Sequence, residues 1–270
     1  MKISRIFLDK NNEDIYLDAY SVPKKSEEKR HALIIIPGGG YSCVCRDREG
    51  DPIALEFISY GFTPFVLNYY TGKKEPFPIQ HIQAARAIKH VKDNADEYGI
   101  NPDEVFVIGF SAGAHLAGCS AILHSHPALY ASIDMESGYT KPRGAMLIYP
   151  VVSTEYHMAS FQNLLCSKEP SKEALHEVSL EKHVDTDSAP VFIMHTSNDG
   201  IVDVRNSLCL ADAYTRAGLQ YEMHIYPDAP HGIALANSVT SCGNEKWDNE
   251  RIAEWVRISA EWAKEIIRKT

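Results

Sequence analysis

Ser111 is the residue best placed to act as a nucleophile. It lies in the run Gly109–Gly113, which reads G-F-S-A-G, follows the apolar stretch Val105–Phe110 and opens a helical pattern. A serine on a sharp strand-to-helix turn exposes its hydroxyl, and small neighbours on either side avoid clashes in the strained turn. The helix amino terminus behind it places N–H groups, that of Ala112 among them, beside developing negative charge. A tight glycine turn without chemistry is the alternative.

A second glycine-rich turn could bind the negative charge that attack by a serine creates. Gly38–Gly40 follows the apolar run His31–Ile36 after one proline. Glycines allow backbone N–H groups to point into a cleft where a side chain would intrude. We expect the N–H of Ala112 and that of Gly39 or Gly40 to form an oxyanion hole. A phosphate-binding loop is disfavoured, because the Gly-Lys-Ser/Thr ending and the G-x-G-x-x-G spacing are missing.

The general base for the serine is expected on a loop after a late strand, since the chain order in folds with this turn is serine, acid, histidine. His231 lies between Pro230 and Gly232, just after the apolar run Tyr221–Tyr226. The flanking proline and glycine indicate an exposed loop. His195 lies within an apolar run and is interpreted as a core or supporting residue. We therefore interpret His231 as the base.

The carboxylate that orients the base is expected after the preceding strand, Val191–Thr196. Asp199 lies three residues beyond that run, in the turn-rich sequence S-N-D-G. Asp203 is the competitor, but it precedes a helical pattern and is suited to cap that helix. Asp228 is a third candidate. We favour Asp199 as the acid and keep Asp203 as the alternative.

Short apolar runs alternate with helical patterns along the chain, and this alternation positions the candidate residues. Near-continuous apolar runs are typical of strands covered on both faces, so the fold class expected is α/β, with a doubly wound, mostly parallel sheet. An antiparallel hairpin is expected at its edge, around Asn11 and Asn12. The predicted strands are His31–Ile36, Thr63–Tyr70, Val105–Phe110, Ala145–Val152, Val191–Thr196 and Tyr221–Tyr226, and the predicted helices are Pro52–Tyr60, Ile79–Tyr98, Ala112–His124, Val204–Ala217 and Lys246–Lys269.

The alternation is interrupted once, at the polar stretch Ser153–Ser188, which contains a proline and a weak helical pattern over Ser171–Val178. We interpret this stretch as a short cap inserted between two strands. No repeat or low-complexity segment divides the chain, so a single domain over residues 1–270 is expected.

Composition excludes several functional classes. The chain has 270 residues and a net charge of −9, which argues against nucleic acid or an anionic membrane surface as a partner. Six cysteines show no zinc-type or C-x-x-C spacing, so no metal site is expected. The amino terminus lacks the apolar core of a signal peptide, and no run is long enough to span a bilayer. These features predict a cytoplasmic protein with a neutral substrate.

With these residues in place, the chain resembles the esterase and lipase branch of the α/β-hydrolases, and within it the small acetyl-esterase and acetylxylan-esterase-like enzymes. The matching segments run in the family's order from about residue 31 to residue 240. One departure is Val202-Asp203, where similar sequences often have V-P after the acid loop. Besides G-F-S-A-G, the segments include Pro37–Tyr41, Glu49–Ala54, Val66–Tyr69, His195–Val202, Asn206–Ala211 and Pro230–Ala236.

The resemblance implies a serine carboxylesterase that hydrolyses short-chain esters, often acetyl groups on sugars such as xylo-oligosaccharides, without a cofactor. Ser111, Asp199 and His231 would be its catalytic residues, and a small-molecule ester its partner. A second copy of the chain is kept as a candidate partner. The alternatives are an acyltransferase with the same acyl-enzyme and a prolyl-oligopeptidase-like peptidase, although such peptidases usually carry a large additional domain.

Overall fold

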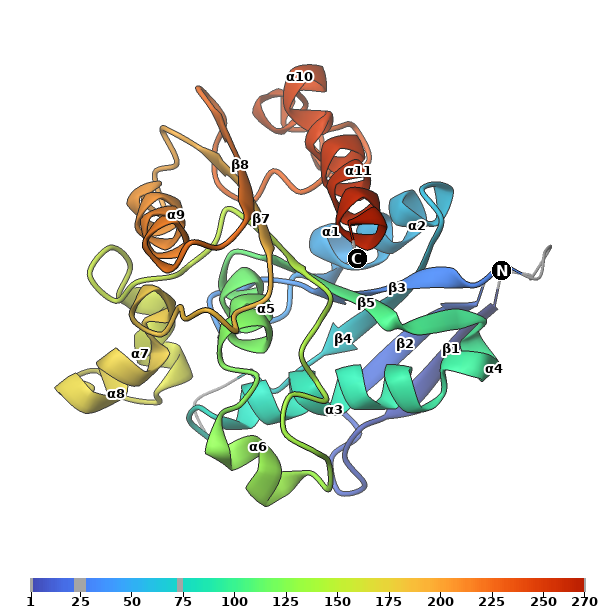
Figure 1. Cartoon of the computed structure of the whole chain (residues 1–270). Coiled ribbons are helices and arrows are strands. Elements are labelled where there is room, and N and C mark those ends of the chain that lie inside the picture. The colour runs from blue at the N-terminus through green and yellow to red at the C-terminus, as the bar shows by residue number, and fades with distance from the viewer. Residues whose placement is uncertain (1, 22–27, 72–74, 270) are drawn as a thin grey trace.

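Eight strands form one continuous sheet in the computed structural model, which describes residues 2–21, 28–71 and 75–269; the first and last residues of the expected domain lie outside it. The strand order is β1-β2-β4-β3-β5-β6-β7-β8 (Figure 1). β1 pairs antiparallel with β2, and β2 with β4, whereas all later pairs are parallel. The strands are β1 (Lys2–Phe7), β2 (Tyr16–Ser21), β3 (Arg30–Ile36), β4 (Phe62–Asn68), β5 (Ile100–Phe110), β6 (Ala145–Ile148), β7 (Val191–Thr196) and β8 (Tyr221–Tyr226).

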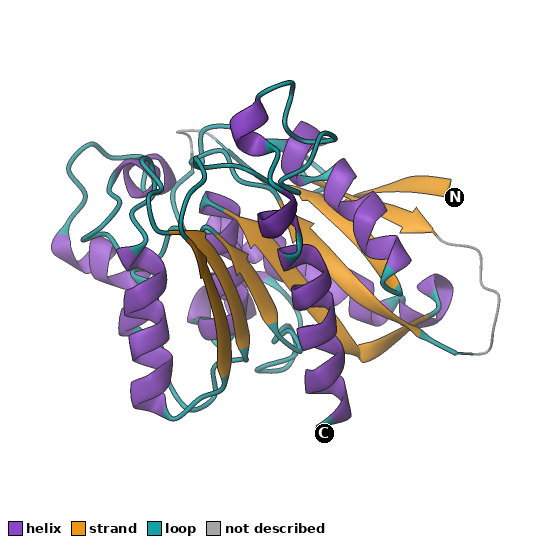
Figure 2. Ribbon diagram, turned by 90° about the horizontal axis from the view of Figure 1, so that it is seen from above, coloured by secondary structure: helices purple, strands orange, loops and turns teal. Residues whose placement is uncertain are grey.

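Helices cover both faces of this sheet (Figure 2), which confirms the predicted doubly wound architecture. In the described ranges no helix is both long and apolar enough to cross a membrane. The α-helices are α1 (Arg46–Glu49), α2 (Asp51–Ser59), α3 (Ile79–Asp93), α4 (Ala95–Tyr98), α5 (Ala112–Ile122), α6 (Pro127–Ser132), α7 (Ala159–Leu164), α8 (Lys172–Val178), α9 (Arg205–Ala217), α10 (Glu250–Ala253) and α11 (Trp255–Arg268), with short 3-10 helices at η1 (Leu180–Lys182) and η2 (Glu245–Trp247).

The alternation of side chains along β3 shows how the two faces are filled. Successive residues of a strand point to opposite faces of the sheet. Ile34 and Ile36 pack in the cluster that includes the buried side chains of α3, α5 and α9, whereas Leu33 and Ile35 pack in the cluster that includes α2 and α11. A strand with apolar partners on both sides must itself be apolar throughout, which explains the uninterrupted run read from the sequence.

Two predicted helices are broken in the structure, the first once and the second twice, and an asparagine lies at one break in each. The prediction Ile79–Tyr98 divides into α3 and α4 at Asn94, whose side-chain amide donates to the carbonyl oxygen of His90 at 2.8 Å. The prediction Lys246–Lys269 divides into η2, α10 and α11, and Asn249 caps the start of α10 by accepting from the N–H of Ile252. Asparagine side chains compete for backbone groups in this way, so they favour helix ends.

The polar stretch between β6 and β7, residues 153–188, contains α7, α8 and η1, and we call it the inserted segment. Ser171 caps α8 by accepting from the N–H of Ala174, as the weak helical pattern there suggested. From α7, the side-chain amide of Asn163 donates to the carbonyl oxygen of Gly40 at 2.8 Å. The inserted segment is therefore fastened to the glycine turn that follows β3.

Candidate active site

Ser111, His231 and Asp199 lie in one hydrogen-bonded row at the carboxyl ends of β5, β8 and β7. His231 Nε2 is 2.8 Å from Ser111 Oγ, and His231 Nδ1 is 2.6 Å from Asp199 Oδ2. The side chain of His231 is 11% exposed and that of Asp199 is fully buried. The loops after parallel strands all lie at the carboxyl ends of the strands, which is why residues up to 120 positions apart in the chain meet here.

The turn that carries Ser111 has a strained backbone, with φ 54° and ψ −118° at the serine. Two glycines make the turn possible. A Cβ on Gly109 would lie 2.2 Å from the carbonyl oxygen of Gly113, and a Cβ on Gly113 would lie 2.1 Å from that of Ile36. Both spacings are far below van der Waals contact, so a side chain on Gly109 would collide with the backbone at the start of α5, and one on Gly113 would collide with the end of β3. The G-x-S-x-G pattern thus has a steric cause.

Asp199 receives hydrogen bonds on both carboxylate oxygens. Its Oδ1 accepts from the N–H groups of Ile201 and Val202 at 2.9 and 3.0 Å. Its Oδ2 contacts His231 and also lies 3.3 Å from His195 Nε2. Burial alone would raise the pKa of the Asp199 carboxyl, but the contacts with His195 and His231 outweigh burial and hold the pKa well below its ordinary range. Asp199 is therefore an anion beside the imidazole.

The two competing carboxylates are engaged elsewhere. Asp203 accepts from the backbone N–H and the guanidinium of Arg205 at the start of α9, and its side chain is 37% exposed. Asp228 is exposed and accepts from the side-chain amide of Asn198. Among the interactions of the described residues, neither carboxylate contacts His231. The structure thus brings Asp199, rather than Asp203 or Asp228, to the base.

The glycine turn lies directly beside the nucleophile. A Cβ on Gly38 would be 3.0 Å from Ser111 Cβ, and the N–H of Gly38 already donates to Glu49 Oε2 at 2.8 Å. Gly39 and Gly40 have φ angles of 124° and 61°, which favour glycine. Within the described residues, the N–H groups of Gly39, Gly40 and Ala112 donate to no protein acceptor. These three N–H groups are the ones expected to receive an oxyanion.

Three neighbours of the site were not singled out for function from the sequence. Glu49 and Tyr149 are buried beside the glycine turn and the base loop, and their hydroxyl–carboxylate contact is 2.8 Å. His157, from the inserted segment, contacts Ser160 Oγ at 3.0 Å and the carbonyl oxygen of Ile201 in the acid loop at 3.2 Å. The spacing of residues around Glu49, Tyr149 and His157 matches no functional motif. Glu49 is only the first residue of one segment that carries the family resemblance.

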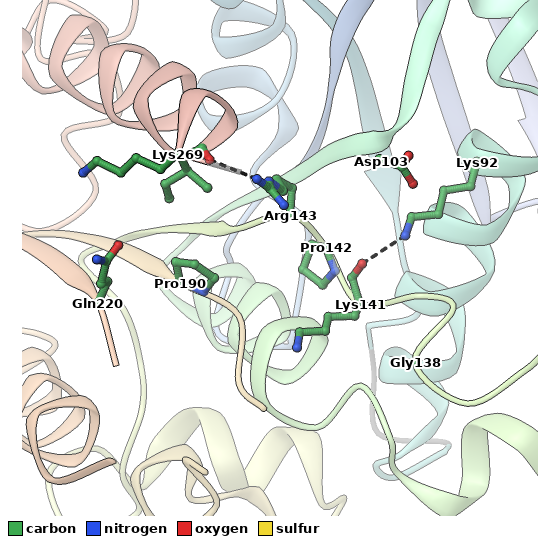
Figure 3. A pocket seen from close by; sticks show the side chains of 10 residues that line it. Lys92, Asp103, Gly138, Lys141, Pro142, Arg143, Pro190, Gln220 and Lys269 are labelled. Carbon is green, nitrogen blue, oxygen red and sulfur yellow. Dashed lines mark hydrogen bonds between the residues drawn. The ribbon is translucent and has the colours of Figure 1, made fainter. Parts of the chain in front are cut away.

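An open hollow of about 770 Å³ lies at the amino-terminal ends of the parallel strands, opposite the candidate site (Figure 3). Several of its lining residues lie just before β6, β7 and β8. Its cations already have protein partners. Lys92 donates to the carbonyl oxygens of Tyr139 and Lys141, and Arg143 donates to that of Ile266. The hollow therefore contributes nothing to the row of Ser111, His231 and Asp199. Across the described residues, no three histidine, cysteine or carboxylate side chains are grouped to hold a metal ion.

The strand order, with a serine turn after β5, an acid loop after β7 and a histidine loop after β8, defines the α/β-hydrolase class. The chain belongs to the BD-FAE family, whose model matches residues 14–214.

Curated relatives match most of this chain but only part of their own length. Endo-1,4-beta-xylanase B from Butyrivibrio fibrisolvens is 35% identical over 218 residues, covering 77% of this chain and 33% of the relative. Acetylxylan esterase from Xylanibacter ruminicola is 26% identical over 213 residues, covering 76% of this chain and 41% of the relative. The chain thus spans less than half the length of either protein.

A solved structure matches along nearly its whole length. The acetyl ester-xyloside bifunctional hydrolase from Caldicellulosiruptor lactoaceticus superposes with a TM-score of 0.83 at 30% identity, covering 97% of this chain and 96% of that one. The carboxylesterase Cest-2923 from Lactobacillus plantarum superposes with a TM-score of 0.85 at 23% identity, which shows a shared fold.

Proposed function

We propose that this protein is a serine carboxylesterase that hydrolyses short-chain esters, acetyl esters in particular, with sugars such as xylo-oligosaccharides as the alcohol. The observation that carries the proposal is the row in which His231 joins the hydroxyl of Ser111 to the buried carboxylate of Asp199. A hydroxyl, an imidazole and a carboxylate in this order form the machinery of nucleophilic acyl transfer. The relatives named for ester hydrolysis support the same reaction.

The reaction would proceed in two halves. His231 Nε2 accepts the proton of Ser111 as Oγ attacks the ester carbonyl, and the N–H groups of Ala112 and the Gly39–Gly40 turn bind the oxyanion. The bond to the alcohol oxygen breaks, and the alcohol leaves with the proton from His231. Water then attacks the acyl-serine, gives a proton to His231, and the carboxylic acid is released as Ser111 regains its proton. Asp199 holds the imidazole in the tautomer that can accept from Ser111.

The side chains of the inserted segment that border the glycine turn favour an ester whose alcohol portion is polar. Ser160 Oγ would lie 3.7 Å from a Cβ on Gly40, and Asn163 donates to the carbonyl oxygen of Gly40, so both side chains border the glycine turn. His157 bonds to Ser160 and to the acid loop. Ser160 is itself buried and bonded to His157, so the half-buried side-chain amide of Asn163 is the group at this border that can exchange hydrogen bonds with the hydroxyls of a sugar. An acetylated sugar fits such a border better than a fatty alcohol.

The proposal is tested first at the nucleophile. Ser111→Ala should leave the fold intact and reduce turnover of an aryl acetate by about 10⁴-fold or more, because the atom that becomes acylated is lost. A fluorophosphonate probe should label the wild-type protein at Ser111 and leave Ser111→Ala unlabelled. Ser120→Ala, on the same helix and away from the row, is the matched control. A folded Ser111→Ala protein with a tenth of wild-type activity would refute the assignment.

A further inference from the structure

Glu49 is a buried carboxylate that accepts two hydrogen bonds, and the two-step reaction gives it no role. It ends α1, which follows the glycine turn, and it is 3% exposed. Its Oε2 accepts from the N–H of Gly38 at 2.8 Å, and its Oε1 accepts from the hydroxyl of Tyr149 at 2.8 Å. Burial raises the pKa of the Glu49 carboxyl, while these two donors act in the opposite direction. A buried carboxylate is costly, so its contacts require an explanation beyond packing.

Tyr149 connects this carboxylate to the loop that carries the base. Its hydroxyl oxygen accepts from the N–H of Ala234 at 3.1 Å, three residues beyond His231. Its ring lies edge-on to the imidazole of His231, with ring centroids 5.0 Å apart. One chain of hydrogen bonds thus runs from Gly38 through Glu49 and Tyr149 to the base loop.

The neighbouring residue of α1 holds the same loop from a second point. Arg48 Nη1 donates to the carbonyl oxygen of Gly232 at 3.1 Å, directly after His231. The guanidinium lies over the ring of Trp247 at 4.5 Å from its centroid, which keeps it in place. Arg48 and Glu49 together tie the glycine turn and the base loop to one short helix.

We infer that Glu49 is a positioning residue for the ester hydrolysis proposed above: its carboxylate fixes the glycine turn on one side and, through Tyr149, the loop of His231 on the other. The inference rests on that proposed function. Both groups must be held within fractions of an ångström of their places for an oxyanion to be bound while a proton moves. A carboxylate accepts from both sides at once, whereas an amide in the same place must turn one donor toward Gly38 or Tyr149.

Glu49→Gln should therefore lower kcat for an aryl acetate by about 10²-fold, the size of effect known for misplacement of about 1 Å, and leave KM within about threefold. Tyr149→Phe keeps the ring on His231 but removes the hydroxyl, and a loss of about 10-fold is expected, smaller because Gly38 stays bound to Glu49. The rate at which a fluorophosphonate labels Ser111 should also fall, more in Glu49→Gln than in Tyr149→Phe. This rate needs no knowledge of the natural ester.

A second readout separates positioning from mere stability. The charged and titratable groups that face Glu49 are Cys45, Arg48, Tyr69, Tyr149 and His231. Removal of one negative charge near the imidazole makes its protonated form less favourable, so the acid limb of kcat/KM in Glu49→Gln should move to lower pH. Loss of stability alone would lower the amplitude of the profile without moving this limb.

Two control variants complete the experiment. Asp47→Asn neutralises an exposed carboxylate on the same helix and should retain wild-type kcat and labelling rate. Ile88→Val removes a buried methylene from α3 and should lower the melting temperature with little change in kcat. The inference is overturned if Glu49→Gln has wild-type kcat, or if its loss equals that of Ile88→Val with the acid limb unmoved. If the wild-type protein neither labels nor hydrolyses esters, the proposed function fails first and the inference with it.

Discussion

Two carboxylates four residues apart, Asp199 and Asp203, have opposite surroundings. The side chain of Asp199 is fully shielded and receives two backbone N–H groups as well as His231. Asp203 is more than a third exposed, and its partner is the exposed guanidinium of Arg205. An exposed ion pair contributes little to stability and is screened by salt, whereas a shielded carboxylate beside an imidazole selects its tautomer and stabilises its protonated form.

Asp199→Asn should consequently reduce kcat by about 10⁴-fold, as the corresponding change does in serine proteases, because the amide can favour the wrong tautomer. Asp203→Asn should change kcat by less than about threefold, since it disturbs a helix start and no catalytic proton. Both variants are measured on one aryl acetate, with circular dichroism as the check on folding. If Asp203→Asn loses most of its kcat while Asp199→Asn keeps wild-type kcat, the acid is Asp203 and not Asp199.

The placement of Ser111, His231 and Asp199 in one row could be predicted because each follows an apolar run in a turn with small or turn-forming neighbours. The local sequence fixes both the residue and its place at the strand end. Glu49 could not be predicted in the same way. Its partner Tyr149 lies 100 positions away, and nothing near Glu49 distinguishes a buried carboxylate from an exposed one. Contacts between distant loops become visible only when the sheet order is known.

At the scale of elements, short helices limited the prediction. α1, α6 and α7 contain four, six and six residues, too few for a 3.6-residue period to emerge, and none was predicted. The strands were predicted within a few residues, with two differences. β5 begins earlier, at Ile100, and β6 ends at Ile148 because Tyr149 has a φ of 39° and leaves the sheet.

The inserted segment leads to a prediction on acyl length. Two of its large apolar side chains, Phe161 and Leu164, are packed in the core and Met158 is exposed, while Ser160 and Asn163 border the glycine turn. A long acyl chain thus meets polar side chains rather than an apolar wall where this segment borders the glycine turn. We expect kcat/KM for acetyl and propionyl aryl esters to exceed that for the octanoyl ester. An apolar channel would instead add about 0.8 kcal/mol per methylene, so kcat/KM that rises up to eight carbons would contradict this prediction.

At the scale of the whole molecule, buried histidines couple the fold to pH. His81, on α3, and His115, on α5, are both almost fully buried. Burial lowers the pKa of His81 to about 3 and that of His115 to about 4. An unfolded histidine titrates near 6.5, so the unfolded chain binds protons between pH 6.5 and those values while the folded protein does not. The contribution of these two neutral histidines to the free energy of unfolding is fully present above about pH 6.5 and is lost as the pH is lowered below that value.

His81 contributes about 2 kcal/mol to the loss of unfolding free energy between pH 7.5 and pH 5.0, at about 1.4 kcal/mol per unit below 6.5. His81→Leu should lose correspondingly less over this interval, because the titrating group is gone. Its Nδ1 has no hydrogen-bond partner in the described part of the chain, so an apolar replacement breaks no bond at that atom. Urea unfolding at the two pH values measures the difference, with the exposed His176→Leu as control. Equal losses in wild type and His81→Leu would disprove the linkage.

β8 closes the sheet and, within the described strands, pairs with β7 alone. The loop of His231 leaves from this outermost strand, while the turn of Ser111 leaves from β5 in the middle of the sheet. Outer strands detach at lower free energy than central ones, and amide hydrogen exchange reports such local opening. Detachment of β8 would separate the base from the serine while the central strands stay paired. The proposed esterase turnover would therefore depend on an outer strand of the sheet and decline on warming before the core melts.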